Sequence, residues 1–144
     1  MLVLMSAAND WNTQIIEEFR KNGGSVETFG GRKLVLLHTT GAKSGDARVN
    51  PVVFLDLDGK RYVFASKAGA DSHPDWFYNL TAHPAVTVEV GTESGIETYP
   101  ATAVVVEGTE RDRVYAIQAE RMPGFAEYQE KTTRTIPVVE LRRA

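Results

Sequence analysis

Short β-prone runs joined by tight turns recur along this chain, and they restrict the folds that are open to it. Residues 33–40 are apolar and β-prone, and residues 49–57 form a second such run. Asp58-Gly59 is a strong hairpin turn that leads into residues 60–66. Three later runs are also predicted strands: 85–90, 97–107 and 137–142. The sequence therefore predicts about six mainly antiparallel strands.

Helical segments interrupt these strands. The first is predicted to be capped by Asn9 or Asp10 and to end at Gly23-Gly24. Three more are predicted: from Pro74 to about residue 82, over about 110–121, and a short one over 125–131. Hairpins mixed with strand–helix–strand connections suit an α+β class, a small antiparallel barrel with helices packed on its outside. We expect residues 1–144 to form one domain.

The composition argues against several classes of function. The formal net charge of −3 argues against broad nucleic-acid binding. The chain has no cysteine, which excludes disulfides and thiolate chemistry, and its three histidines lack metal-ligand spacing, so no metal site is predicted. No apolar run approaches the roughly 20 residues of a membrane span. Residues 1–5 are too short for a signal peptide, so we expect a cytoplasmic protein.

Two cations and a hydroxyl share the turn between the first two predicted strands, residues 41–48 (GAKSGDAR), which we call the basic turn. Such a turn can aim Lys43, Ser44, Arg48 and the Gly45 amide at an anion. It is not a Walker phosphate loop, because no glycine directly precedes Lys43. Ordinary solvated turns contain the same residue types, so on these residues alone the two interpretations stand equal.

A second group of residues lies in a loop of small side chains, residues 65–74 (ASKAGADSHP). Small residues such as Ala70 allow a ligand to approach backbone N–H groups, and the following helix adds positive potential. Lys67 offers another cation. The alternative is a plain helix entrance with Ser72 or His73 as its cap.

Two aromatic segments are candidates for contacts with a ligand. Trp76 and Asn79 are three residues apart and lie on one face of the predicted helix, where they can border a heterocycle. Phe125 and Tyr128 have the same spacing and can flank an apolar substrate. Packing in the core is the alternative for both pairs.

Several blocks, taken together and in order, resemble the deazaflavin-dependent nitroreductase family of actinobacteria. The blocks are residues 37–45 (LHTTGAKSG), 48–51 (RVNP), 65–70 (ASKAGA), 74–80 (PDWFYNL), 83–84 (HP) and 134–137 (RTIP). The resemblance extends over most of the chain, from about residue 11 to residue 139.

This resemblance implies a split β-barrel related to the flavin-mononucleotide-binding oxidases. It also implies reduced coenzyme F420, an 8-hydroxy-5-deazaflavin with an anionic tail that suits the basic turn. Lys43, Ser44 and Arg48 match the positions that hold the phosphate and acidic tail. The full set implied for the coenzyme is Lys43, Ser44, Gly45, Arg48, Asn50, Pro51, Ala65, Ser66, Lys67, Ala70, Trp76 and Asn79.

The activity implied is hydride transfer from the reduced deazaflavin to a quinone, a nitro compound or an activated alkene. The cofactor supplies the chemistry, and the protein supplies orientation and electrostatics. We expect the substrate near Phe54, Phe125 and Tyr128. Ser66, Tyr128 or water can deliver the proton that the product needs.

Other interpretations remain open beside this one. The chain could carry a deazaflavin or a lipid-like molecule without turnover, or it could be an FMN oxidoreductase on the same fold. Reduction of nitroimidazoles, the natural substrate and a monomeric or homodimeric state are not determined. Because quinones reside in membranes, peripheral contact with the inner membrane through residues 1–8 is also open.

Overall fold

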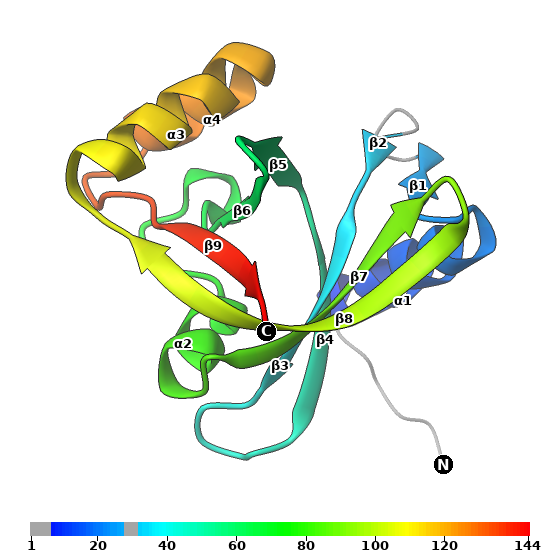
Figure 1. Cartoon of the computed structure of the whole chain (residues 1–144). Coiled ribbons are helices and arrows are strands. Elements are labelled where there is room, and N and C mark those ends of the chain that lie inside the picture. The colour runs from blue at the N-terminus through cyan, green and yellow to red at the C-terminus, as the bar shows by residue number, and fades with distance from the viewer. Residues whose placement is uncertain (1–6, 28–31) are drawn as a thin grey trace.

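The computed structural model describes residues 7–27 and 32–144, and it contains one large sheet of seven antiparallel strands (Figure 1). The strand order in this sheet is β4-β3-β7-β8-β9-β6-β5. In chain order the strands are β3 (Val35–Thr40), β4 (Ala47–Val52), β5 (Phe54–Leu57), β6 (Lys60–Phe64), β7 (Ala85–Thr92), β8 (Gly95–Val106) and β9 (Val138–Arg143). A separate two-stranded sheet pairs β1 (Ser25–Val26) with β2 (Arg32–Lys33).

The two edge strands of the large sheet are neighbours in sequence. β4 ends at Val52 and β5 begins at Phe54, yet these strands lie at opposite ends of the strand order. Two residue steps reach at most about 7 Å, so the sheet must curl until its edges meet at Val53. Figure 1 shows the ribbon continuing from β4 to β5 across this corner. The result is a split β-barrel, which confirms the predicted fold class.

The single strand predicted over residues 49–57 is wrong, because the structure divides this run at Val53. The run reads VNPVVFLDL, and its four residues around the division, 52–55, are all apolar, so no turn residue marks the division itself. Val53 is partly buried and packs against both hydrophobic clusters on the outer side of the sheet. The large sheet therefore has seven strands, one more than the number of runs in the sequence.

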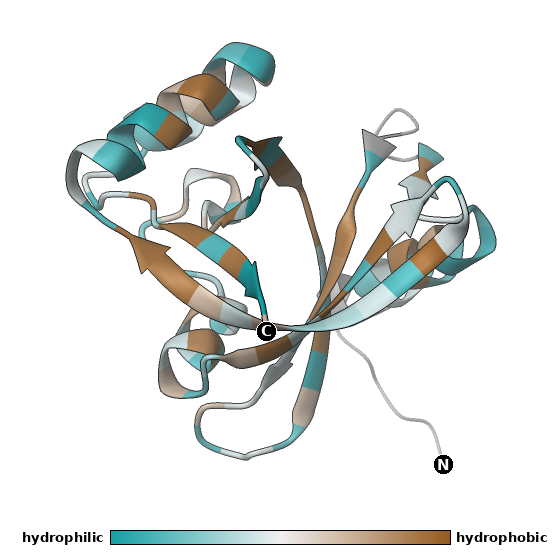
Figure 2. Cartoon of the chain, viewed as in Figure 1, coloured by the Kyte–Doolittle hydropathy of each residue, from teal (hydrophilic) through white to brown (hydrophobic). Residues whose placement is uncertain are grey.

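Alternate residues of each strand pack on the two sides of the curled sheet. On β3, Val35 and Leu37 belong to the inner cluster, whereas Leu36 packs outward. On β6, Val63 faces inward and Phe64 outward. Figure 2 shows hydrophobic residues along the crossing strands. Both faces of the sheet are therefore covered, and the barrel interior is packed with side chains.

Three helices cover the outer side. α1 (Ala7–Lys21) places Ile15 and Phe19 beneath β3. Because α1 includes Asn9 and Asp10, neither residue caps it as predicted. α3 (Gly108–Arg121) and α4 (Gly124–Glu130) cover the strands at the other end of the sheet.

α2 (Asp75–Ala82) differs from the other helices because it contributes to the inner cluster, through Trp76 and Leu80. α2 therefore packs its apolar residues against the barrel interior, whereas α1, α3 and α4 cover the outer side. This helix begins one residue after Pro74, which is extended, with φ −66° and ψ 153°. In residues 7–27 and 32–144, no helix is long and apolar enough to span a bilayer. The proposed membrane contact falls largely on residues 1–6, which lie outside the described residues.

Candidate functional site

The basic turn joins β3 to β4 and is held by its own hydrogen bonds. The Gly41 N–H donates to the Asp46 carbonyl at 2.8 Å, and the Gly45 N–H donates to the Gly41 carbonyl at 2.9 Å. The Asp46 N–H donates to Ser44 Oγ at 3.1 Å. A Cβ at Gly41 would lie 2.5 Å from Ser44 Oγ, so the turn closes tightly at this glycine. The turn is therefore a defined structure rather than an open loop.

Three polar side chains of the basic turn face solvent. Lys43 is exposed and forms no ion pair within the described residues. Arg48 is half exposed; its Nη1 donates to the Ala47 carbonyl at 3.2 Å and lies 3.9 Å from the Asp46 carboxylate. The Gly45 N–H is already used inside the turn, so the anion contact expected from this amide has no donor here. Lys43, Ser44 and Arg48 remain the groups able to bind an anion.

Asn79 of α2 holds the basic turn in place. Its Oδ1 accepts the Ala42 N–H at 2.9 Å, and its Nδ2 donates to Thr39 Oγ1 at 3.3 Å. The side chain is buried, as is Trp76 one turn earlier, which is 6% exposed in the inner cluster. The burial of Trp76 and Asn79 favours the alternative given for this pair, packing in the core, and a contact of either with the coenzyme stays a prediction. Asn79 instead fixes the position of the turn relative to α2.

The strand after the basic turn separates two of the predicted coenzyme residues. Asn50 lies opposite Leu37, which belongs to the inner cluster, and Arg48 shares its face two residues earlier. Pro51 lies opposite Leu36, on the side that faces α1. Arg48 and Asn50 thus share the inner side, and Pro51 does not.

The small-residue loop has a strained backbone. Lys67 and Ala68 have φ values of +45° and +53°, followed by Gly69 at +83°. Left-handed conformations are uncommon outside glycine, and they concentrate at functional sites. The loop contains the short helix η2 (Lys67–Gly69), in which the Gly69 N–H donates to the Ser66 carbonyl at 2.9 Å. Lys67 Nζ donates to Ser72 Oγ at 3.2 Å, so one hydrogen bond of this ammonium group is already used within the loop.

Gly69 brings this loop against α4. A Cβ at Gly69 would lie 2.8 Å from the Tyr128 carbonyl oxygen and 3.0 Å from its Cα. The structure therefore places Ser66 and Tyr128, the two predicted proton donors, in contacting segments. Within the described part of the chain, neither of their hydroxyls has a hydrogen-bond partner. Both hydroxyls are thus free to serve a ligand.

Arg134 contacts the small-residue loop, and the residue-by-residue reasoning missed it. Its guanidinium donates to the carbonyls of Ala65, Ser66 and Ala70 at 3.1, 2.8 and 2.8 Å. It also lies 3.0 Å from His73 Nδ1. Burial and the Arg134 charge lower the pKa of His73. The only signal in the sequence was the block of residues 134–137.

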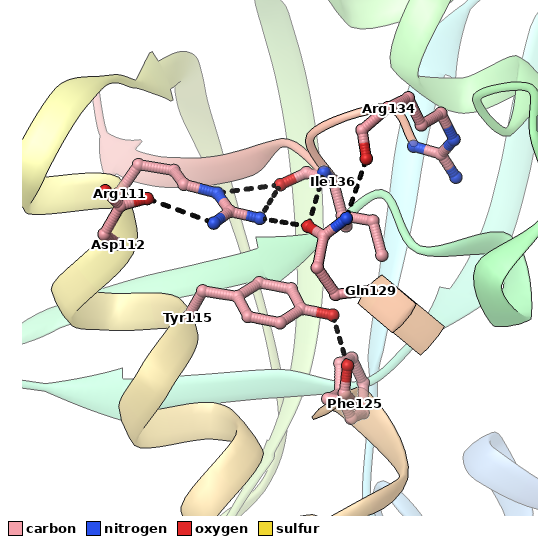
Figure 3. A network of polar contacts seen from close by, with 7 residues as sticks. All are labelled: Arg111, Asp112, Tyr115, Phe125, Gln129, Arg134 and Ile136. Atoms are coloured by element: carbon pink, nitrogen blue, oxygen red, sulfur yellow. Dashed lines mark hydrogen bonds and ion pairs between the residues drawn. The ribbon is translucent and has the colours of Figure 1, made fainter. Parts of the chain in front are cut away.

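A polar network connects Arg134 to the helices (Figure 3). Gln129 of α4 donates to the Arg134 carbonyl at 2.7 Å and accepts from the Ile136 N–H at 3.0 Å. Arg111 of α3 donates to the same Gln129 oxygen at 2.8 Å and to the Ile136 carbonyl. Since α4 also touches the small-residue loop, the loop and both helices form one connected unit.

The three residues predicted to line a substrate pocket do not come together. Phe54 packs against the inner cluster, whereas Phe125 is buried in the outer cluster with Phe64. Tyr115 Oη donates to the Phe125 carbonyl at 2.6 Å, which fixes this segment in the core. Only Phe125 and Tyr128 are neighbours, with ring centroids 5.2 Å apart. Of the three, the half-buried Tyr128 is the one beside the strained loop.

A cavity of about 600 Å³ lies elsewhere, and residues of β5, β6, β8 and β9 line it. Its walls include Arg61, which forms two hydrogen bonds with Asp56, and Arg143, which is paired with Glu97 at 3.0 Å. These arginines are neutralised by carboxylates, so the cavity is a poor site for an anionic tail. Among the described residues, no cluster of potential ligands could hold a metal ion.

Comparisons with known proteins show which family the chain resembles. The family model described as F420H(2)-dependent quinone reductase matches residues 11–142. An F420H(2)-dependent quinone reductase of Mycobacterium tuberculosis is 37% identical over 113 residues, which cover 76% of this chain and 72% of that protein. A solved F420-H2-dependent reductase is 41% identical, with a TM-score of 0.66, over 76% of this chain and 93% of the other. Another similar structure, a domain-swapped dimer, is 35% identical with a TM-score of 0.68, over 94% of this chain and 100% of the other.

Proposed function

The chain belongs to the F420H(2)-dependent quinone reductase family, and from that premise we propose how its own residues serve the reaction. The resemblance to deazaflavin-dependent reductases inferred from the sequence is confirmed. The protein is an oxidoreductase, and its coenzyme is F420. Quinone reduction is the activity that the family supports, and it is the conclusion we draw for this chain.

The observation that carries the site assignment is the basic turn fixed on α2 by Asn79. Over residues 7–27 and 32–144, Lys43 has no carboxylate partner and Arg48 has only the 3.9 Å contact with Asp46; Ser44 adds a hydroxyl donor. These donors fit a phosphate and an acidic tail, because hydrogen bonds between charged groups are stronger than those between neutral groups. We therefore propose that these three side chains hold the anionic end of the coenzyme.

The small-residue loop is proposed to line the ring end of the coenzyme. Ala65, Ser66 and Ala70 have small side chains, and the left-handed backbone at Lys67 fixes their orientation. When bound, reduced F420 supplies a hydride to an electron-poor acceptor. Ser66 and Tyr128 lie on contacting segments, and their hydroxyls have no partner among the residues that the structure describes, so either can donate the proton that completes the reduction.

We propose quinones as the substrate class, with nitro compounds and activated alkenes as further acceptors to be tested. Tyr128 is the proposed substrate contact, because its half-buried ring lies beside the loop. The partly buried Phe54 and the buried Phe125 pack on opposite sides of the sheet, so they contribute to the core.

The decisive experiment mixes the purified protein with reduced F420 and menadione and follows deazaflavin absorbance. We expect oxidation of F420 that depends on both protein and quinone. Binding without oxidation by any quinone indicates a carrier, and tight binding of FMN in place of F420 indicates a flavin oxidoreductase. The same assay with a nitroimidazole and an activated alkene tests the wider substrate range.

Two properties stay predictions. Contact with a membrane is proposed for the apolar start of the chain, which is outside the described residues, and vesicle co-sedimentation tests it. A monomer or a homodimer is expected in solution, and light scattering distinguishes the two.

A further inference from the structure

The guanidinium of Arg134 joins the two ends of the strained turn. It donates through Nη1 and Nη2 to the Ala65 and Ser66 carbonyls, and through Nε to the Ala70 carbonyl. Between these carbonyls lie the left-handed residues Lys67 and Ala68. A planar group with donors in a fixed fork can hold several acceptors in one geometry, which the point charge of a lysine cannot do.

The same guanidinium determines which ring nitrogen of His73 carries the proton. Arg134 Nη1 lies 3.0 Å from His73 Nδ1. An arginine side chain only donates hydrogen bonds, so Nδ1 must accept. The neutral ring then carries its proton on Nε2. Phe77 packs against the ring with centroids 4.7 Å apart, so the imidazole is fixed by a second contact as well.

The backbone of Arg134 is itself held by α4. Gln129 Nε2 donates to the Arg134 carbonyl at 2.7 Å (Figure 3). The next residue towards the N-terminus, Tyr128, packs its backbone against Gly69 of the strained turn. α4 therefore supports the turn twice, directly at Gly69 and indirectly through Arg134.

We propose that Arg134 is a positioning residue of the coenzyme site, which acts by holding the turn of residues 66–69 and by fixing the Nε2–H tautomer of His73. The link to the coenzyme rests on the proposed function, in which this turn lines the deazaflavin. The link to His73 does not, since it concerns the protein alone. The two links can therefore be tested separately.

The first test needs no coenzyme. Nitrogen-15 NMR of the imidazoles at neutral pH should show His73 as the Nε2–H tautomer in the native protein. In Arg134→Lys the tautomer signals should change, whereas in Arg61→Lys they should not. Arg61 is a matched control because it is also partly buried, and it bonds to Asp56 and Tyr99 away from the turn. An Nδ1–H tautomer in the native protein overturns this part of the proposal without any variant.

The second test measures F420 affinity by fluorescence titration. We expect Arg134→Lys to weaken binding at least tenfold, and Arg61→Lys to leave it unchanged. Circular dichroism and thermal unfolding report whether each variant is folded. If Arg134→Lys does not fold, Gln129→Leu takes its place, because it removes the support of the Arg134 backbone. Native affinity in a folded variant that has lost these contacts overturns the proposal.

The third test is chemical rescue. In Arg134→Ala, millimolar guanidinium should restore part of the F420 affinity, and the same concentration of ammonium should not. Equal effects of both cations mean that the arginine serves only general packing or charge, which contradicts the proposal. If the native protein itself does not bind F420, the proposed function fails, while the tautomer test still decides the role of Arg134 towards His73.

Discussion

The side-chain oxygen of Asn79 accepts the backbone N–H of Ala42 at 2.9 Å, although the two residues are 37 positions apart. This bond ties the basic turn to α2, which itself packs into the inner cluster. The anion-binding turn is therefore anchored to the core of the barrel. An exposed turn between two strands would otherwise be free to move.

Asn79→Ala should lower both stability and coenzyme affinity. It leaves the Ala42 N–H and Thr39 hydroxyl without partners, which costs about 1–3 kcal/mol of unfolding free energy. Urea unfolding and F420 titration measure the two effects. Thr81→Ala is the control, since its hydroxyl donates on the exposed side of the same helix, and it should change stability by less than about 0.5 kcal/mol. Equal losses in both variants would contradict the anchoring role.

Replacing both cations of the basic turn should weaken F420 binding strongly. A hydrogen bond to a charged group contributes about 1.5–3 kcal/mol, so Lys43→Ala with Arg48→Ala should reduce affinity about a hundredfold or more. Added salt should reduce the difference in F420 affinity between the native protein and the double variant, because salt screens the charges of exposed side chains. Lys21→Ala with Lys60→Ala removes the same charge elsewhere and should have little effect. Unchanged fluorescence titrations of the first double variant would refute the assignment.

Protonation of the Glu89 carboxylate should lower the stability of the protein in acid. Burial raises the pKa of Glu89, but hydrogen bonds from Arg20, at 3.0 Å, and from His38 outweigh burial and hold the pKa below its usual range. The unfolded chain then binds more protons in acid than the folded chain does. Glu89 therefore stabilises the folded protein at pH values above its pKa in the unfolded chain. This stabilisation is lost as the pH falls through its pKa in the folded protein. Urea unfolding across this range should show a shallower decline for Glu89→Gln.

Much of this arrangement follows from local sequence signals. Turn residues mark the hairpins, and the chemistry of the basic turn is local, so both could be predicted. The corner at Val53 could not, because the apolar residues 52–55 around it fit the middle of one long strand as well as two edges of a curled sheet. The contribution of α2 to the inner cluster could not be predicted either, since an apolar helix face does not reveal which cluster it joins.

The contacts that complete the site are long-range. Arg134 reaches residues 61 to 69 positions away, and no local pattern indicates such a partner. Phe54 and Phe125 were expected to share a pocket, but the alternation of β5 directs Phe54 inward while α4 packs outside. Whether these residues lie together depends on the direction of their side chains within the fold, which residue type does not determine.

Two glycines allow the contact between the strained turn and α4 to be measured. Gly59 and Gly69 have φ values of +76° and +83°, so alanine at either position carries the left-handed penalty of about 1–2 kcal/mol. A Cβ at Gly59 meets nothing within 4 Å, whereas one at Gly69 would lie 2.8 Å from the Tyr128 carbonyl oxygen. Gly69→Ala should therefore lose more unfolding free energy than Gly59→Ala in urea titrations. It should also weaken F420 binding, which Gly59→Ala should not, and equal behaviour of the two variants would mean that the turn and α4 separate without cost.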